Sequence, residues 1–185
     1  KLLGTVDYLS SIIDKFRYFF NPNNEIENFS VCEAIKENLV IFESSYKSNN
    51  INLILNLDDI YISGYKFELM QVVINIINNS KDALSEKSIM DKEENYIFMK
   101  TDVKEKVLTL SIYDNAGGID EELAEKIYEP YFTTKHQSQG TGLGLYMSNE
   151  IIKKHFNGKL SNKTIEYEYE DKNFKGEEFK IEIPL

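Results

Sequence analysis

The stretch Asn75-Ile-Ile-Asn-Asn-Ser-Lys-Asp-Ala83 lies inside a run of residues whose apolar positions recur every three or four, as in an amphipathic helix. We therefore expect one long helix over residues 65–85 that contains this stretch. Asparagine is a mediocre helix former, so the asparagines at 75, 78 and 79 oppose the local helical propensity. Asn75 and Asn79 are four residues apart and therefore share one face of the helix.

The polar face of this helix has two interpretations. A side-chain carbonyl of Asn79, with Asn75 nearby, suits Mg²⁺, a hard cation that takes few protein ligands and completes its shell with phosphate and water oxygens. The alternative is that these amides are solvated or hydrogen-bonded to neighbouring turns. The stretch by itself is compatible with both.

A second polar segment, Asp114-Asn-Ala-Gly-Gly-Ile119, directly follows a hydrophobic strand expected over residues 107–113. A carboxylate at the end of a strand can accept a hydrogen bond from a ligand amine, and the glycines after it let the backbone approach that ligand closely. The same composition is also that of a plain turn, so this segment alone is weak evidence.

Two more segments complete the set. Glu129-Pro-Tyr-Phe-Thr-Thr-Lys135 places aromatic residues before two hydroxyls and a cation, which also suits a surface loop with a hydrophobic anchor. Gly140-Thr-Gly-Leu-Gly-Leu145 runs into a helix expected over residues 143–155, and N–H groups ahead of a helix N-terminus bind phosphate oxygens. It is not a Walker A loop, because no Gly-Lys-Ser/Thr follows, and Leu145 stands where a Rossmann fingerprint needs its third glycine.

The remaining pattern mixes helices and strands without strict βαβ alternation. The periodicity predicts strands over 26–30, 51–57, 61–63, 96–101, 107–113, 159–162, 165–169 and 178–183, and helices over 31–47, 65–85, 123–128 and 143–155. The acidic run 166–171 is expected to be a solvated hairpin. These elements predict an α+β fold, a two-layer α/β sandwich with a mixed, mostly antiparallel sheet packed against helices and preceded by one bundle helix.

That preceding helix is expected at the start of the chain. Its seam positions are spaced four, three, four, three and four apart, and they are Leu2, Val6, Leu9, Ile13, Phe16 and Phe20. Pro22 ends the pattern. We interpret residues 1–22 as one arm of a dimerising helical hairpin whose other arm lies before Lys1, and residues 26–185 as a separate domain. The alternative is a helix that packs on its own domain.

Composition excludes several function classes. The 21 Lys and Arg against 31 Asp and Glu give a net charge of −10, which argues against a nucleic-acid partner. One cysteine forms no internal disulfide and favours a reducing compartment, and two histidines make a histidine-based metal cluster improbable. No apolar run approaches the ~18 residues of a membrane span. Because the first residue is Lys1, we expect a piece of a longer chain.

In this order, the four segments resemble the boxes of the catalytic and ATP-binding domain of bacterial sensor histidine kinases, a branch of the superfamily of gyrase, heat-shock chaperone, histidine kinase and MutL ATPases. The similar stretches are 67–83 for the N box, 114–119 for the first glycine box, 128–135 for the F box and 140–145 for the second glycine box. Residues 179–184 are similar to the last strand of that domain. The resemblance implies an ATP-binding domain over 26–185 and the second helix of the dimerisation hairpin over 1–22.

The resemblance also implies roles for single residues. Asn79 would bind the Mg²⁺ that bridges the ATP phosphates, Asn75 would line the phosphate side, and Lys135 would sit near the phosphates. Asp114 would accept the exocyclic amine of adenine, and Gly118 would let the backbone approach the base. Residues 133–142 would form a lid. The other residues implied to contact the nucleotide are Asp82, Ile119, Thr133, Thr134, Gly140, Thr141, Gly142, Leu143, Gly144 and Leu145.

Two departures from the family pattern bear on function. Ala116 holds the first glycine position of the Asp-x-Gly-x-Gly box, which costs little if its φ is negative. Asn75 stands where the ATP-hydrolysing cousins have a glutamate that orients water, and an amide is no general base. Asn75 therefore favours a kinase over an ATPase. The alternatives are an ATPase or an anti-sigma type serine kinase of the same superfamily, and a degenerate module that no longer binds nucleotide.

Neither histidine fits the phosphate acceptor that the resemblance implies. His136 lies between the F box and the second glycine box, and His155 closes the helix before Asn157-Gly158, where a cation favours the helix C-terminus. We expect the acceptor histidine upstream of Lys1, so this chain should bind ATP without phosphorylating itself. The implied partners are ATP, a response regulator receiver domain and a second copy through the N-terminal helix, in a cytoplasmic domain of a parent that can be membrane-anchored.

Overall fold

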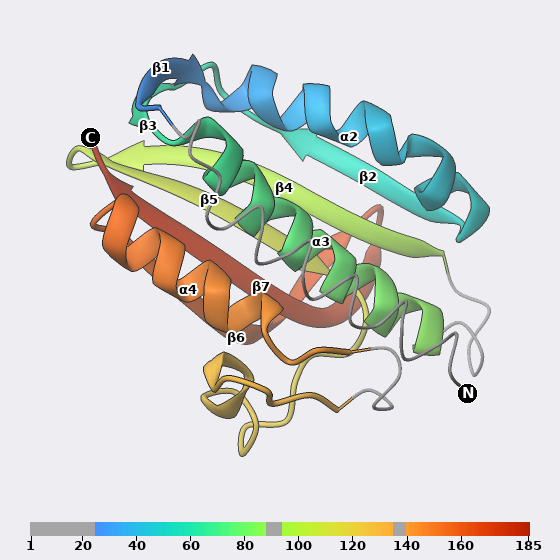
Figure 1. Ribbon diagram of the computed structural model, residues 1–185. Coiled ribbons are helices and arrows are strands. Elements are labelled where there is room, and N and C mark those ends of the chain that lie inside the picture. Colours follow the sequence, from blue (N-terminus) through green and yellow to red (C-terminus); the bar gives the residue numbers. More distant parts are fainter. Residues whose placement is uncertain (1–24, 88–93, 135–139) are drawn as a thin grey trace, which may run out of the picture.

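The computed structural model describes residues 25–87, 94–134 and 140–185, so the helix expected near the N-terminus lies outside the described residues (Figure 1). The elements in chain order are β1 (Glu27–Ser30), α2 (Val31–Ser48), β2 (Ile51–Asn56), β3 (Tyr61–Gly64), α3 (Lys66–Lys87), β4 (Asn95–Lys104), β5 (Val107–Asp114), the 3₁₀ helix η1 (Lys126–Tyr128), α4 (Gly144–His155), β6 (Lys159–Tyr169) and β7 (Lys172–Pro184). No helix in these described ranges is both long and apolar enough to cross a membrane.

The predicted two-layer architecture is confirmed. The main sheet has the strand order β2-β4-β5-β7-β6, in which β2 and β4 are parallel and the other neighbours antiparallel. Strands β1 and β3 form a separate antiparallel pair. Helices α2, α3 and α4 cover the same face of the main sheet (Figure 1).

The core fills the space between these helices and the sheet. Strand β5 alternates buried and half-buried residues, so Leu108, Leu110 and Ile112 all point into the core. They pack with fully buried isoleucines of the helices, including Ile76 of α3 and Ile151 of α4. Each such side chain stabilises the fold by roughly 1.5–3 kcal/mol, so this face fixes how α3 and α4 lie on the sheet.

Two tight hairpins order the antiparallel strands. Glu105 and Lys106 between β4 and β5 have φ of 51° and 62°, and Glu170 and Asp171 between β6 and β7 have φ of 49° and 59°. Two successive positive φ values are the mark of type I′ turns, whose twist matches that of the strands they join. The expected hairpin in the acidic run 166–171 is therefore confirmed, and a turn of the same type joins β4 to β5.

Several expected elements differ from the structure. The strand predicted over 178–183 is longer and begins at Lys172. The strands predicted over 159–162 and 165–169 are one strand, because the polar residues between them keep their pairing with β7, as in Lys163↔Glu178. The helix predicted over 123–128 is reduced to isolated turns and η1, in which Glu129 N–H donates to the Lys126 carbonyl (2.9 Å). Pro130 disfavours helical geometry at the residue before it, so the helix does not propagate.

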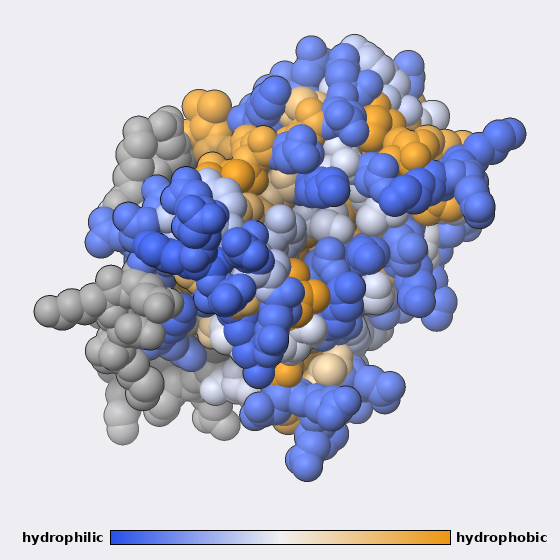
Figure 2. All heavy atoms as spheres, turned by 180° about the vertical axis from the view of Figure 1, so that it is seen from behind, coloured by the Kyte–Doolittle hydropathy of each residue, from blue (hydrophilic) through white to orange (hydrophobic). Residues whose placement is uncertain are grey.

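The face of the sheet turned away from the helices carries a small aromatic cluster. Its buried members are Tyr96, Phe98 and Phe174, and Ile54, Tyr113, Tyr167 and Tyr169 pack around them. The rings of Phe98 and Tyr113 stack with centroids 4.8 Å apart, and the ring of Tyr167 stands edge-on to both. This cluster fastens the long β6–β7 hairpin to β4 and β5. Around it, this side of the molecule is mostly hydrophilic with scattered hydrophobic patches (Figure 2).

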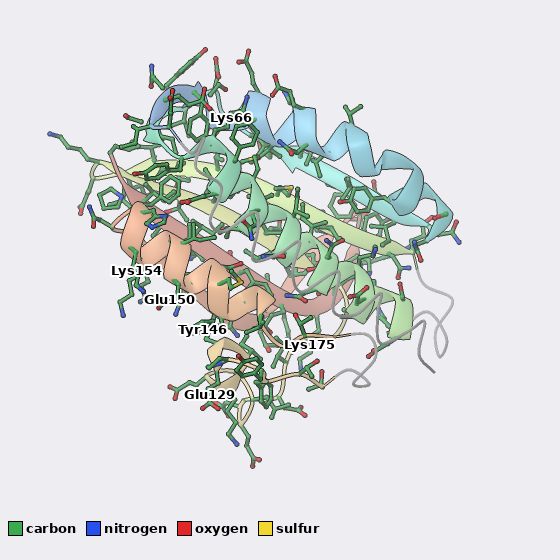
Figure 3. The ribbon with its side chains drawn as sticks, viewed as in Figure 1. Lys66, Glu129, Tyr146, Glu150, Lys154 and Lys175 are labelled. Carbon is green, nitrogen blue, oxygen red and sulfur yellow. The ribbon has the colours of Figure 1, made fainter. Side chains whose placement is uncertain are left out.

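Polar contacts fix the ends of the helices. An ion pair between Lys66 at the start of α3 and Glu37 of α2 (2.9 Å) ties these helices together. At the end of α4, Asn157 adopts a left-handed φ of 48°, and Gly158 N–H donates to the Ile152 carbonyl (3.0 Å), so these two residues cap the helix C-terminus. On its outer side, α4 carries Tyr146, Glu150 and Lys154 in one row, the last two as an ion pair (Figure 3).

Candidate functional site

One cavity of about 330 Å³ brings together residues from all four predicted segments. Its walls come from α3, the turn after β5, the loop around η1, the glycine segment before α4, and β7. The lining residues are Asn75, Asn78, Asn79, Ser80, Asp82, Ala83, Glu86, Asp114, Ala116, Gly118, Ile119, Leu123, Ile127, Phe132, Thr133, Thr134, Gly140, Thr141, Gly142, Gly144, Leu145, Glu177 and Phe179.

Almost every residue singled out in the sequence lies in this wall. Among the predicted site residues within the described ranges, Leu143 is the exception, because its side chain is buried and does not line the cavity. Lys135 lies outside the described residues, as does His136. The roles assigned to all of these residues stay predictions.

Asn75 joins the two helices that border the cavity. Its Nδ2 donates to the Ser148 hydroxyl (3.3 Å) and to the Gly144 carbonyl (3.5 Å) at the start of α4. Ser148 also donates to Gly144 (2.9 Å), so the three residues form a small network at the first turn of α4. The alternative interpretation of the asparagines was that their amides bond to neighbouring turns. Asn75 makes such bonds, and it also lines the cavity.

Asp114 forms the buried end of the cavity. Its side chain is only 2% exposed, and its Oδ1 accepts the backbone N–H groups of Ala116 (3.0 Å) and Glu177 (3.3 Å). Burial raises the pKa of Asp114 above its ordinary value, and these amides act in the opposite direction. Ala116 has a negative φ, so the missing first glycine of the box does not strain the turn.

Glycines let the backbone segments around Asp114 touch one another. Gly118 has a φ of +89°, and a Cβ there would lie 2.5 Å from the Thr164 side chain of β6. A Cβ on Gly176 of β7 would lie 1.6 Å from the Asp114 carbonyl oxygen. Gly117 N–H donates to the Lys175 carbonyl (2.9 Å). The turn after β5 is therefore built directly against the β6–β7 hairpin.

The backbones of the F box and the second glycine box contact each other directly. Tyr131 N–H donates to the Gly142 carbonyl (2.9 Å), and these residues have left-handed φ values of 67° and 63°. A Cβ on Gly142 would lie 2.4 Å from the Tyr131 carbonyl carbon, so glycine is needed for this approach. A positive φ at a tyrosine is sterically strained, and such strain concentrates at functional sites.

The charges in the described part of the wall are all negative: Asp82, Glu86, Asp114 and Glu177 line the cavity, and no lysine, arginine or histidine among the described residues does. Those ranges also hold no cluster of three or more His, Cys, Asp or Glu that suits a metal ion. The oxygens of Asn79 and Asp82 nevertheless fit Mg²⁺, since that ion takes one or two protein ligands and completes its shell with phosphates and water.

His155 is placed away from this cavity. It is the last residue of α4, where its Nδ1 bonds to the buried carboxylate of Glu68 in the first turn of α3. The ring of Tyr65 packs against it with centroids 5.3 Å apart. This position agrees with the expected structural role at the helix end.

Sequence reasoning missed two buried polar residues of the wall, Ser80 and Glu177. Ser80 directly follows Asn79, and no pattern marks it. For Glu177 a signal was available, because the alternation of Phe179, Ile181 and Ile183 extends back to position 177. A glutamate in the inward register of a strand is unusual enough to be noticed.

Fold and cavity together define an α/β sandwich whose glycine segments and asparagine helix surround a site for a phosphate-bearing ligand. A family model described as histidine kinase-, DNA gyrase B-, and HSP90-like ATPase matches residues 64–185. The chain belongs to this family, and the resemblance inferred from the four boxes is confirmed.

Relatives place the chain in the histidine kinase branch of the family. It is 31% identical to the signal transduction histidine-protein kinase AtoS of Escherichia coli (strain K12) over 157 residues, which are 83% of this chain and 24% of that relative. It is 36% identical to sporulation kinase A of Bacillus subtilis (strain 168) over 98 residues, 53% of this chain and 15% of the kinase. The chain spans between 10% and 28% of the length of eight such curated relatives.

Solved structures show the same fold. The catalytic domain of histidine kinase ThkA superposes with a TM-score of 0.68 at 30% identity, covering 86% of this chain and 95% of that domain. A crystal structure of ThkA in complex with the response regulator protein TrrA gives a TM-score of 0.71 at 25% identity, covering 97% of this chain and 48% of ThkA.

Proposed function

We propose that this chain is the ATP-binding catalytic domain of a two-component sensor histidine kinase, and that it transfers the γ-phosphoryl group of ATP to a histidine upstream of Lys1. The observation that carries the proposal is the convergence of four separate segments on one cavity, with a buried carboxylate at one end and glycine-rich backbone at the other. Membership of the family supports it.

At the buried end, Asp114 selects the base. Its Oδ1 is engaged by two backbone amides, which leaves Oδ2 to accept the exocyclic amine of adenine. Guanine presents a carbonyl oxygen at that position, and an ionised carboxylate has no proton to donate to it. The positive φ of Gly118 brings the backbone of the turn beside the base.

At the other end, backbone N–H groups hold the phosphates. Gly140, Gly142 and Gly144 line the cavity before and at the start of α4, whose N-terminus carries the positive end of the helix dipole. The hydroxyls of Thr133 and Thr134 lie in the same wall, and we propose that Lys135 adds a cation beside them. Asn79 and Asp82 would hold Mg²⁺, which would neutralise phosphate charge in a wall that otherwise repels it.

The asparagine at position 75 favours transfer to a protein side chain over hydrolysis. Its amide is hydrogen-bonded to Ser148 and Gly144, and an amide is not a general base that activates water. Phosphoryl transfer depends mostly on positioning and charge neutralisation, so the residues of this wall suffice without a nucleophile of their own.

We propose the same partners as for sensor kinases in general. The ThkA structure holds a response regulator, and a receiver domain is the partner we propose for this chain too. A second copy would pair through residues 1–22. The free Cys32 suits a reducing cytoplasm, where we place the domain.

The test is Mg²⁺-dependent ATP binding by calorimetry on the whole chain and on Asp114→Asn. We expect the chain to bind MgATP and the variant to lose at least tenfold in affinity. The carboxylate of Asp114 can only accept a hydrogen bond from the adenine amine, whereas an asparagine amide can also present an N–H donor to it. Equal binding by both, or by neither, would contradict the site. A longer chain with the upstream segment should then carry acid-labile, base-stable phosphate. Acid-stable phosphoserine would instead indicate the anti-sigma type of kinase.

A further inference from the structure

A second buried carboxylate lies beside Asp114 in the cavity wall. Glu177 of β7 is 3% exposed, although its carboxylate lies where the described part of the wall offers no cation. Burying a charge is costly unless hydrogen bonds replace its hydration. Glu177 therefore needs hydrogen bonds from the polar groups around it, and those groups show which segments Glu177 connects.

Donors from two other segments meet at this carboxylate. Its Oε1 accepts from the Asn162 amide (2.6 Å), and its Oε2 accepts from the Thr164 hydroxyl (2.8 Å), both on β6. Oε2 also accepts from the backbone N–H of Ile119 (3.0 Å) at the end of the turn that follows β5. The side chain thus ties that turn to the β6–β7 hairpin.

The main chain of the same residue holds the other end of the turn. Glu177 N–H donates to Oδ1 of Asp114 (3.3 Å), and the preceding Gly176 passes so close to the Asp114 carbonyl that no Cβ fits between them. Glu177 therefore contacts both the first and the last residue of the segment Asp114–Ile119. No other residue of β7 has bonds to both ends.

We propose that Glu177 is a positioning residue for the base end of the nucleotide site. Glu177 fixes the orientation of the Asp114 side chain and the distance between the Gly117–Ile119 turn and the base. This inference rests on the proposed ATP-binding function and extends it. Local choices that cost stability without a packing gain are characteristic of functional sites. An apolar side chain would fill the same inward register of β7 at lower electrostatic cost, but it would leave the Ile119 N–H with only its longer bond to the Thr164 hydroxyl (3.2 Å).

A matched set of variants tests the role: Glu177→Ala, Glu177→Gln and Glu178→Gln. Glu178 is the next residue on the same strand and points to the opposite face, where it pairs with Lys163 (3.3 Å) and Lys180 (4.0 Å). Affinities for MgATP and MgGTP would be measured by calorimetry on the whole chain, together with the unfolding temperature and the amide proton shift of Ile119.

We expect Glu177→Ala to weaken MgATP binding about tenfold or more, and Glu177→Gln to recover most of it, because the amide oxygen still accepts the Ile119 N–H. The weak MgGTP binding should change less, so the preference for ATP should fall. The Ile119 amide proton should move upfield in Glu177→Ala. Glu178→Gln should stay within twofold of the unsubstituted chain.

The opposite outcomes are as informative. If Glu177→Ala lowers the unfolding temperature but binds MgATP as well as the unsubstituted chain, the residue is only structural and the inference is wrong. If Glu177→Ala does not fold, Asn162→Ala decides, because Asn162 is half-buried and its loss removes the amide donor to Oε1 of Glu177 (2.6 Å): a two- to fivefold weakening supports the inference, and unchanged binding overturns it. If the unsubstituted chain itself does not bind MgATP, the proposed function fails.

Discussion

Replacing Gly176 by alanine is the most direct test of how the base end of the cavity is built. The new Cβ would lie 1.6 Å from the carbonyl oxygen of Asp114 and 2.5 Å from its carbonyl carbon, whereas Cβ atoms essentially never approach another atom closer than 3.0 Å. One segment must therefore move by about 1.4 Å. Both clashing atoms belong to the backbone, so no change of rotamer relieves the contact.

The cost of this movement is estimated from overpacked cores. Extra methylenes in tightly packed sites destabilise by about 1–3 kcal/mol, and a backbone clash belongs at the upper end. For a domain of this size each kcal/mol lowers the midpoint of thermal unfolding by about 2–4 °C, so Gly176→Ala should unfold about 6–12 °C earlier. It should also weaken MgATP binding about tenfold or more, since Asp114 Oδ1 would lose its alignment with the backbone amides.

The matched control is Gly144→Ala in the first turn of α4. A Cβ there would meet Asn75 at 3.8 Å, an ordinary contact, so stability should hold or rise by up to about 1 kcal/mol. Thermal unfolding followed by circular dichroism, with calorimetry for the nucleotide, measures both effects. If Gly176→Ala unfolded within 2 °C of the unsubstituted chain and bound MgATP equally well, the close approach of β7 to Asp114 would be refuted.

Three further predictions follow from charges and burial. Burial raises the pKa of Asp114 in the folded chain above its value in the unfolded chain. Protonated Asp114 therefore favours the fold below the unfolded pKa, and this contribution is lost as pH rises through the folded pKa. Asp114→Asn should raise the urea midpoint at neutral pH even though it removes nucleotide binding. Asn79→Ala should weaken ATP binding about tenfold or more with Mg²⁺ present and change it little in EDTA, and equal losses in both conditions would remove Asn79 from the metal site. Burial raises the pKa of Tyr46 to about 12, and the Glu94 hydrogen bond followed by burial raises the pKa of Tyr96 to about 12, so stability should fall as pH rises from about 10 to 12. Ring resonances of these two tyrosines that titrate near pH 10 in the folded chain would contradict this.

Most of the fold was predictable because its elements are periodic. Helix α3 and strand β5 carry their apolar residues at regular spacing, and the boundaries differ from those expected by one or two residues. Strand β6 was not predictable as one element, since Asn162, Lys163 and Thr164 look like a turn and only pairing with β7 keeps them extended. The helix expected over 123–128 does not form, although its apolar spacing favours one, because Pro130 disfavours helical geometry at the residue before it.

The site was predictable where a residue type is unusual in its element. Asparagines in a helix and glycines before one break local propensity, and those residues were identified. Leu143 was expected to contact the nucleotide because it lies within the second glycine box, yet its side chain turns into the protein. Glu177 escaped because its significance depends on Ile119 and Thr164, which are 58 and 13 residues away in the chain. Contacts between distant segments leave no trace in local spacing.

The aromatic cluster behind the sheet gives this domain an optical property. The chain contains twelve tyrosines and no tryptophan, so tyrosine dominates its near-ultraviolet spectrum. The hydroxyl of Tyr167 donates to the Asp114 carbonyl (3.0 Å), and its ring stands edge-on to Phe98 and Tyr113. A ligand that shifts the backbone at Asp114 will therefore alter ring packing on the far side of the sheet. Near-ultraviolet circular dichroism can follow occupancy of the cavity without any label.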